Sequence, residues 1–544
     1  MSVTSFTAQP RPDVPLATAG RSGYAPPIKT ALARRPWQPW QRVLFRVAFP
    51  FFILLSLPSD LGWYKNLLTI DWLHGHYRDV YDIARFSPSF FLRGGGGEGG
   101  APALLGYGNW FIALGVALLI GLVWTLLSRK QQEYEVLYYW LRVIVRFRAG
   151  IGIIGFGFTK VFPTQMPYPS IGLLNSDFGD MTAQKIFWLQ IGIVPWYQVF
   201  TGVVELLAGT LLFFRRTTFL GAALLLGALG DIVFVNFAYD GGVHVYSSYF
   251  VLLAAFLLVQ DVPNLYNLLI REQYTVPQHY YPQFRAAWLR FTRLGLKVAT
   301  IGIFLVYLTY LEYLNFTYDP YKQPAQKGIT ELRGFYNVTE FQLNGRVLPY
   351  SPLDSMRWQQ ATFEKWTSFT YKVNRPHKLD LSNGGGSPMR DINRTFETTG
   401  LAGGQRVFYY DADPQTHTLY LQSKVLTGKE GRRGQAREKP GANSSAQYQA
   451  SLAGWIPAAA QARIGDETYK INPAALSTRR ERGIKTEQKP EQRDRMTLTY
   501  HTTDGGRRVV LRGLNERKDS LYVVLTRVDH KYTLSESTLS AGQY

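Results

Sequence analysis

Four ionisable side chains interrupt apolar segments, and they are the strongest candidates for chemistry in this chain. The stretch GIGIIGFGFTKVFP, residues 150–163, is apolar and rich in glycine until it reaches Lys160. Arg148 precedes this stretch, and Glu205 and Asp231 interrupt two later apolar runs. A charge at the centre of a bilayer costs about 2.5–3.5 kcal/mol on insertion scales, so such residues usually face other helices and have partners. We therefore expect these side chains to face the interior of a bundle.

These residue types fit the binding of a polar group and the transfer of a proton. An ammonium group such as that of Lys160 can donate to a carbonyl oxygen or stabilise a developing anion, while Glu205 or Asp231 exchanges protons. Helical rise puts Asp231 at about the depth of Lys160, which predicts a polar pocket for a head group whose lipid tail stays in the bilayer. Arg148 and three further residues, Asn236, Tyr239 and His244, are candidates for binding that head group.

Each of these residues also has a purely structural explanation. Lys160 can extend its ammonium group to the lipid head groups, and Arg148 can anchor the inner end of its helix. Glu205 can belong to a buried ion pair that fixes helix register, and Asp231 can make a polar contact in the outer half of the membrane. His244 titrates in a range that suits a proton carrier, but a lone loop histidine is also a common surface residue.

The segments that carry these residues are long enough to cross a bilayer, which takes about 20 residues of helix. We expect seven spans, at residues 43–61, 107–128, 140–162, 191–214, 217–238, 247–266 and 297–316. The first is the weakest, because Arg46 and Pro50 interrupt it. Between the first two spans, residues 62–106 form an outside loop. Its stretch DWLHGHYRDVYDIARF suits a helix at the membrane interface.

Basic residues fall on one side of the membrane if all seven segments cross. They lie before the first and seventh spans, between the second and third spans, and between the fourth and fifth spans. The residues are Arg34, Arg35, Arg42, Arg129, Lys130, Arg142, Arg146, Arg215, Arg216, Arg285, Arg290, Arg293 and Lys297. Because cytoplasmic loops carry the excess of Lys and Arg, we expect a cytoplasmic N-terminus. Residues after 317 then lie outside, in the periplasm if the membrane is a bacterial inner membrane.

Composition excludes several classes of site. The chain has no cysteine, which excludes disulfides, thiolate zinc sites and covalent c-type haem. The formal net charge of +20 is explained by basic loops and soluble segments, so we expect no nucleic acid partner. His74 and His76 are too sparse to predict a metal site.

After residue 317 the pattern changes to short alternating stretches. Residues 335–350 place Asn344-Gly345 between two β-type runs, which predicts a hairpin. Further strands are expected at 367–373, 406–411, 417–423, 496–502, 507–513 and 519–528. The pattern predicts a C-terminal antiparallel β barrel or sandwich, with mobile charged insertions near 428–445 and 472–495.

Residues 147–266 resemble the four-helix module of the DoxX-like integral membrane family. That family has an arginine opening its first helix, a Gly-x-x-Lys-like ending, an E-L-x-x-G on the second helix and an R-x-T step into the third. The corresponding residues here are Arg148, Gly157 with Lys160, Glu205 with Gly209, and Arg216 with Thr218. With its flanking spans and β domain, the chain looks like the larger members of Bacteroidetes-type bacteria.

The resemblance implies membrane redox chemistry. DoxX-like proteins include a subunit of thiosulfate:quinone oxidoreductase, so the implied cofactor is a quinone and the implied partner is a membrane or periplasmic redox protein. A weaker resemblance is to the vitamin K-dependent carboxylase-like membrane domain. In that family a helix-borne lysine acts as a base on a reduced naphthoquinone, and here the corresponding residue would be Lys160.

The sequence therefore divides into five parts: a basic tail at 1–41, two helices with an outside loop at 42–146, the DoxX-like module at 147–270, a loop and seventh helix at 271–317, and the β domain at 318–544. Three functions stay open. The chain is a quinone-linked oxidoreductase or its membrane subunit, a non-catalytic anchor whose β domain binds a ligand or partner, or a carboxylase-like enzyme with Lys160 as base.

Overall fold

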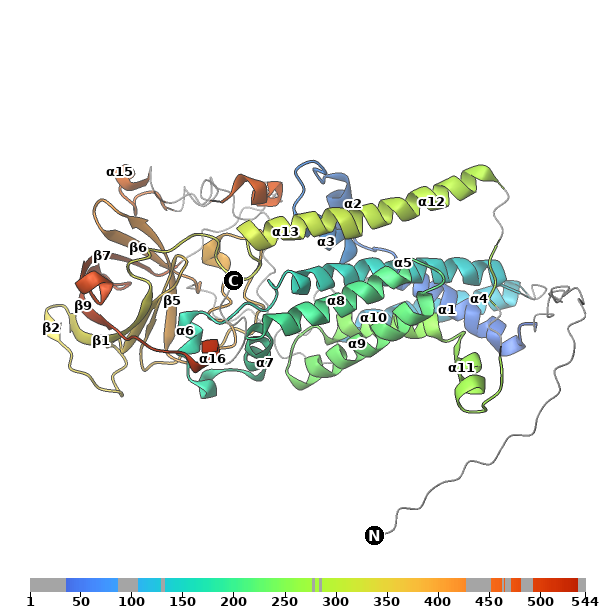
Figure 1. Cartoon of the computed structure of the whole chain (residues 1–544), viewed down its shortest axis with the longest axis horizontal. Coiled ribbons are helices and arrows are strands. Elements are labelled where there is room, and N and C mark those ends of the chain that lie inside the picture. The colour runs from blue at the N-terminus through green and yellow to red at the C-terminus, as the bar shows by residue number, and fades with distance from the viewer. Residues whose placement is uncertain are drawn as a thin grey trace, which may run out of the picture.

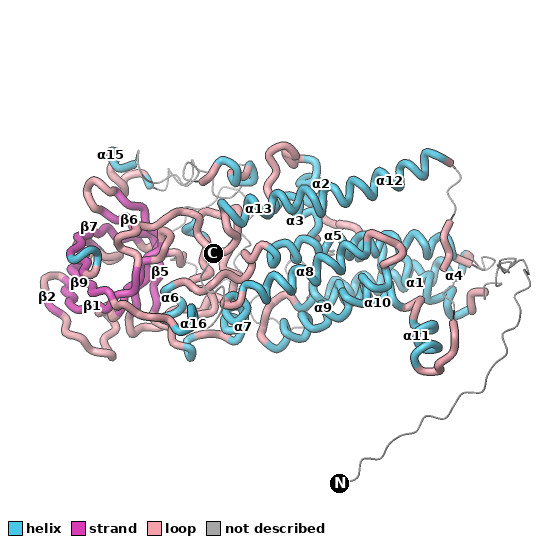
Figure 2. The backbone as a smooth tube through the Cα atoms, viewed as in Figure 1, coloured by secondary structure: helices cyan, strands magenta, loops and turns pink. Residues whose placement is uncertain are grey.

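The computed structural model describes residues 36–86, 106–128, 133–275, 279–282, 286–426, 452–461, 464, 471–480 and 493–536. The described part is elongated, with a bundle of helices at one end and a sheet of strands at the other (Figures 1 and 2). The predicted insertion at 428–445 and the tail at 1–35 lie outside the described residues.

The helical part follows the apolar segments of the sequence. Its helices are α1 (Pro39–Ser56), α2 (Leu61–Leu68), α3 (Tyr77–Ala84), α4 (Gly108–Leu127), α5 (Glu135–Val161), α7 (Ala183–Gly192), α8 (Pro195–Leu212), α9 (Thr218–Ala238), α10 (His244–Leu258), α11 (Val262–Leu269), α12 (Ala287–Ile301) and α13 (Leu308–Tyr318). A π-helical segment, η3 (Gly302–Tyr307), joins α12 to α13 without a break. The range predicted to form a four-helix module, 147–270, contains the second half of α5, the long helices α8, α9 and α10, and the shorter helices α7 and α11 together with one helical turn at residues 171–174.

Several of these helices are long and apolar enough to cross a membrane. In the described part of the chain, α4, α9 and the continuous α12–α13 meet this test alone. Three bent pairs, α1–α2, α7–α8 and α10–α11, bring the number to six if each pair is one span. The predicted number of seven is not confirmed. The remaining helix, α5, carries Arg142, Arg146, Arg148 and Lys160, and these charges lower its hydropathy.

The loop between α1 and α4 contributes a helix to the bundle interior. We predicted an interfacial helix there, but one face of α3 is fully buried through Tyr77, Val80 and Ala84. Tyr81 packs so closely on α5 that a Cβ at Gly155 would lie 2.9 Å from its ring. The aromatic and aliphatic face of α3 therefore packs against protein, and α3 lies between α5 and α13.

The C-terminal strands close into an antiparallel barrel. They are β1 (Gly334–Leu343), β2 (Arg346–Val347), β3 (Gln360–Phe363), β4 (Ser368–Lys372), β5 (Gln405–Asp413), β6 (Thr418–Ser423), β7 (Arg495–Thr503), β8 (Arg508–Leu514) and β9 (Ser520–Arg527). Each strand pairs with its neighbour in order, β1 also pairs with β9, and β2 only extends the β1 hairpin. The prediction missed β3, whose four residues are too few to show a period.

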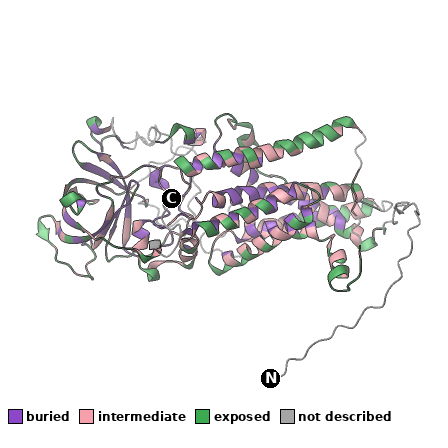
Figure 3. Cartoon of the chain, in the orientation of Figure 1, coloured by how far each residue is buried: buried purple, intermediate pink, exposed green. Residues whose placement is uncertain are grey.

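The barrel interior is filled by large side chains. Trp358 and Tyr371 stack with ring centroids 4.0 Å apart, and Phe369 and Phe408 pack beside them. Twenty-two buried residues form this core, and the strands are coloured mostly as buried in Figure 3. An eight-stranded barrel is just wide enough to be filled by side chains. The hypothesis of a ligand-binding β domain would place an apolar ligand in the barrel interior, but side chains fill that space.

The barrel is held against one end of the bundle, here called the barrel end. Glu364, between β3 and β4, accepts hydrogen bonds from the backbone N–H groups of Ile171 (3.1 Å) and Gly172 (2.8 Å) at the start of α6 (Ile171–Leu174). Lys372 of β4 forms an ion pair with Asp177, at 2.5 Å. Because these contacts join segments almost 200 residues apart, they fix the barrel to the loop between α5 and α7.

One of these contacts predicts a pH-dependent stability. Burial, together with the nearby carboxylate of Glu397, raises the pKa of Glu364 from 4.5 to about 7. Between these two values the folded protein keeps a proton that the unfolded chain has released, so stability falls as the pH rises through this window. We expect the thermal unfolding midpoint of the detergent-solubilised protein to fall between about pH 5 and pH 8, and to fall less in Glu364→Gln.

The matched control is Glu340→Gln, which changes a half-buried glutamate on β1. It should keep the pH dependence of the wild type. An unchanged slope in Glu364→Gln would show that another group is responsible for the loss of stability.

Candidate functional site

The candidate site lies on α5 and α8, whose backbones touch at two pairs of glycines. A Cβ added at Gly202 would lie 2.7 Å from the carbonyl oxygen of Gly157. Seven residues further along each helix, a Cβ at Gly150 would lie 3.0 Å from the carbonyl oxygen of Gly209. Small residues permit this close approach of membrane helices. The two helices therefore run antiparallel, with almost no side-chain layer between them at these points.

Two of the predicted residues meet across this contact. Lys160 of α5 donates from Nζ to Oε1 of Glu205 on α8. Both residues are buried, with 8% and 2% of their surfaces exposed. The second carboxylate oxygen, Glu205 Oε2, is buried and has no hydrogen-bond partner among the described residues. The site is thus an ion pair with one acceptor oxygen left open.

The structure does not bring Asp231 to this pair. Asp231 is exposed on α9, in the outward-facing part of the helix that includes Gly227 and Phe234. Nothing lies within 4 Å of a Cβ built at Gly227 or Gly230, so this side of α9 is open in the described structure. Helical rise placed Asp231 at the same depth in the membrane as Lys160, but it does not tell which way a helix is rotated. The rotation of α9 turns Asp231 away from the pair.

The other predicted binding residues gather around the turn between α9 and α10. Asn236 is buried and donates from Nδ2 to the carbonyl oxygen of Ile232, at 2.7 Å. The ring of Tyr239 packs on Phe187 of α7, with centroids 5.0 Å apart. His244 is buried at the start of α10 rather than exposed in a loop. These residues help to shape the barrel end of the bundle.

Arg148 lies at the middle of α5 rather than at a helix end. Its guanidinium group donates to the carbonyl oxygen of Ala84 (3.0 Å), the last residue of α3, and to that of Phe86 (2.6 Å), two residues later. It also lies 3.9 Å from the centre of the Phe86 ring. A cation at a helix C-terminus interacts favourably with the free carbonyl groups there. Arg148 therefore holds α3 inside the bundle.

A buried polar network at the junction with the barrel was missed from the sequence. Asp319, just after α13, forms an ion pair with Arg394 and accepts a hydrogen bond from Oγ of Ser387 at 2.5 Å. The same hydroxyl lies 3.3 Å from Nε2 of His76. The four residues come from three distant segments, so no local spacing links them. The one local feature in the sequence is Asp319-Pro320 after an apolar helix, and this pair indicates only that the helix ends there, not that a polar network forms.

The hydrogen bonds of this network fix the direction of its protons. His76 Nδ1 accepts from the backbone N–H of Arg78 at 3.2 Å, as the N-cap of α3. A neutral His76 must then carry its proton on Nε2 and donate it to Ser387, while the Ser387 hydroxyl donates to Asp319. This order, His to Ser to Asp, differs from that of a catalytic triad, in which the serine donates to the histidine.

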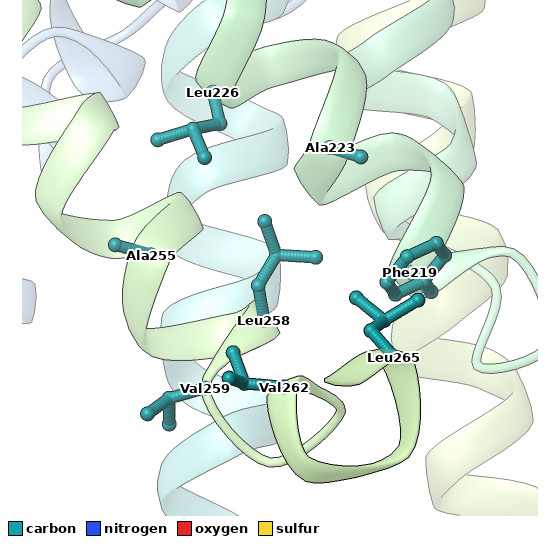
Figure 4. Close-up of a pocket in the computed structure, with 8 residues that line it drawn as sticks. All are labelled: Phe219, Ala223, Leu226, Ala255, Leu258, Val259, Val262 and Leu265. Carbon is teal, nitrogen blue, oxygen red and sulfur yellow. The ribbon is translucent and has the colours of Figure 1, made fainter. Parts of the chain in front are cut away.

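Neither a metal site nor the pocket of Figure 4 coincides with the ion pair in the described part of the chain. Among the residues that the structure describes, no group of three or more His, Asp or Glu side chains is arranged to hold a metal ion. An apolar pocket of about 370 Å³ opens between α9, α10 and α11, lined by Phe219, Ala223, Leu226, Ala255, Leu258, Val259, Val262 and Leu265 (Figure 4). It lies near the end of α10 that is remote from the barrel.

Comparisons with known proteins leave the family open. The chain is 34% identical over 93 residues to the uncharacterized protein YwoB of Bacillus subtilis (strain 168). The match covers 15% of this chain, and the chain spans 60% of the length of that protein. No protein-family model and no solved structure matches the chain. The resemblance to DoxX-like proteins therefore stays an expectation from the quoted motifs.

The glycine contact that positions the ion pair makes a direct prediction. In Gly202→Ala, the new methyl group would meet backbone atoms of α5 at 2.7 Å, so α5 and α8 must separate. Overpacking of this kind costs about 1–3 kcal/mol. We expect a lower thermal unfolding midpoint in detergent. Gly227→Ala on α9 has open space around it and is the control, which should leave the midpoint unchanged. Equal midpoints for the two variants would contradict the close contact.

Proposed function

We propose that this protein is a quinone-linked component of a membrane redox system, and that Lys160 and Glu205 form its head-group site. The observation that carries the proposal is the buried ion pair in which Oε2 of Glu205 has no partner among the described residues. A structural ion pair is expected to satisfy both carboxylate oxygens, because a buried acceptor without a partner costs about 1–3 kcal/mol.

The residues present fit a quinone. A carbonyl oxygen needs a hydrogen-bond donor, which the ammonium group of Lys160 supplies, and a hydroxyl needs an acceptor, which Oε2 of Glu205 supplies. The Lys160 side chain keeps 10% of its surface exposed, so the pair can be approached from the surface of the bundle. A bound quinone supplies two-electron, two-proton chemistry, with electrons from a partner redox protein.

In this proposal the chain's own residues orient the head group and move protons. Lys160 holds a carbonyl oxygen, and its positive charge favours negative charge on that oxygen. Glu205 holds or releases a proton at Oε2 while Oε1 stays bonded to Lys160. Because both residues are buried, little water surrounds the two charged groups, which strengthens their interaction.

A quinone measurement tests this function. The protein is purified in mild detergent and extracted with organic solvent, and quinone is quantified by mass spectrometry. We expect near-stoichiometric quinone in the wild type and at least ~10-fold less in Lys160→Ala and Glu205→Gln, since losing about 1.4 kcal/mol of binding is tenfold in affinity. Asp231→Asn, which removes an exposed carboxylate on α9, is the control and should retain quinone.

A charge-reversed double variant separates a functional pair from a structural one. Lys160→Glu combined with Glu205→Lys keeps an ion pair between α5 and α8 but exchanges donor and acceptor. We expect it to recover the stability lost in each single change without recovering quinone. Quinone that returns with stability, or no quinone in the wild type, would reject the proposal.

The second candidate function, a membrane anchor that binds a partner protein, is favoured by the barrel. Its interior is filled by aromatic side chains, so binding would use the outer surface or the loops rather than an enclosed cavity. In this case Lys160 and Glu205 serve packing alone. Wild-type protein that lacks quinone but captures a defined partner through the barrel would support it.

For either function we propose a bacterial inner membrane with a cytoplasmic N-terminus and a periplasmic barrel. The support is the charge distribution: the first turns of α12, with Arg290 and Arg293, lie at the end of the bundle away from the barrel (Figure 1). Arg142 lies at the same end, where it donates to the carbonyl oxygen of Leu257 at the end of α10. Basic residues favour the cytoplasmic side.

The absence of cysteine allows a clean test of this orientation. Arg517→Cys places a thiol on an exposed turn of the barrel, and Arg216→Cys places one on the exposed turn between α8 and α9. In spheroplasts of a bacterial host, a membrane-impermeant maleimide should label the first variant, and the second only after permeabilisation. The opposite labelling pattern would reverse the topology.

A further inference from the structure

The final helix of the bundle carries a line of buried polar side chains that the quinone proposal does not use. Glu312 and Asn315 lie on one face of α13, and Asp319, four residues after Asn315, is the C-cap of the same helix. Their exposed fractions are 0%, 1% and 0%. Asp319 is bonded to Arg394 and Ser387 at the barrel junction. The line thus leads from that junction into the bundle.

The inner part of this line has no partners among the described residues. Both carboxylate oxygens of Glu312 and both amide atoms of Asn315 are buried without a hydrogen bond. A buried polar group without a partner is costly, and groups of this kind in native proteins are usually satisfied by ordered water or a ligand. Four such atoms one helical turn apart are enough polar partners for a buried water molecule, which typically makes about three hydrogen bonds.

A second feature points to the same place. The π-helical segment η3, Gly302–Tyr307, ends five residues before Glu312. Each π-helical turn adds a residue to the helix and rotates the following face by about 100°. Such segments are rare and occur frequently at functional sites. Here the segment sets which face of α13, and therefore which polar residues, turn toward α3.

The charged groups around Glu312 are already paired with one another. From α3, Arg78 lies 3.2 Å from Asp82, and Asp79 lies 2.9 Å from Arg479, which follows the short helix η6 (Pro473–Ala475). Tyr77 of α3 donates to the carbonyl oxygen of Ser387. The apolar residues Phe158, near the end of α5, and Phe162, just after it, belong to the cluster that packs around α3 and α13. Of these groups, Arg78 interacts electrostatically with Glu312 but already balances Asp82.

We propose that Glu312 and Asn315 form a hydrated proton-binding site, connected along α13 to the network of Asp319, Ser387 and His76. The site binds one proton: the Glu312 carboxylate takes it from a hydronium ion of the solvent, which leaves as water, and the resulting carboxylic acid donates to the buried water. At the junction, Ser387 accepts a hydrogen bond from Nε2 of His76 and donates one to Asp319, so the line of polar groups continues from the site to the barrel.

This site is independent of the Lys160–Glu205 pair, because it uses α3 and α13 rather than the contact of α5 with α8. The proposal therefore does not rest on quinone binding. It adds a second ionisable site near the barrel end, on a helix for which the sequence predicted only a membrane span.

A hydrophobic carbodiimide tests the site in the unaltered protein. Dicyclohexylcarbodiimide adds to a protonated carboxylic acid in an apolar environment and rearranges to a stable N-acylurea, with no other reactant. We expect purified full-length protein to be modified at Glu312 at neutral pH, as located by peptide mass spectrometry. If another carboxylate were modified at least ~10-fold more than Glu312, the proposal would be overturned. It would also be overturned if sodium chloride, but not choline chloride, strongly protected Glu312 from modification, because that result would assign the site to a metal cation.

Infrared spectroscopy supplies an independent measurement. We expect the carboxylic acid C=O band of the wild type to shift in D₂O, because a hydrated acid exchanges its proton, and to be lost in the isosteric variant Glu312→Gln. Asn315→Leu, which removes the water partners, should slow this exchange at least ~10-fold. Asp231→Asn is the control for loss of an unrelated carboxyl group. A band that is unchanged in Glu312→Gln, or that does not exchange, would overturn the proposal.

Discussion

The bundle depends on how the charges of α5 find partners, because a buried charged group is costly unless other protein groups bond to it. Four cationic side chains of α5 each contact a different neighbour. Arg142 donates to the carbonyl oxygen of Leu257 on α10, and Arg146 donates to the hydroxyl of Thr218 on α9. Arg148 donates to carbonyl groups at and just after the end of α3, and Lys160 pairs with Glu205 on α8. One charged helix thereby sets the positions of four others.

Glycine makes this arrangement possible at the contact with α8. Close approach at Gly157 and Gly202 shortens the distance that the Lys160 side chain must cover, so its ammonium group reaches Glu205 without leaving the helix interface. The cost of burying both charges is offset by their attraction in a medium of low dielectric constant. Removing either partner alone would leave the other charge uncompensated.

The junction with the barrel follows a different rule. There the loops after α5 and α13 are tied to the barrel by carboxylates that accept backbone N–H groups, such as Glu364 with Ile171 and Asp391 with Gln326. Bonds of this kind satisfy loop donors that would otherwise be buried without partners. Since the barrel core is filled, the contacts of this domain with the bundle use segments between its strands, where Arg394 and Ser387 bond to Asp319 and η6 lies against α13.

The sequence by itself determined the elements. Period-two stretches and the Asn344-Gly345 turn located every strand except β3, and the apolar runs located the long helices, because both patterns are local. It also identified Lys160 and Glu205 as residues that need partners, because a charge in an apolar run is visible without a structure. Only the tertiary structure decided which charges meet. It paired Lys160 with Glu205, left Asp231 exposed, moved α3 into the bundle and buried Glu312, Asn315 and Asp319. Helix rotation and long-range packing set these contacts, and they depend on the shape of neighbouring helices rather than on spacing along one segment.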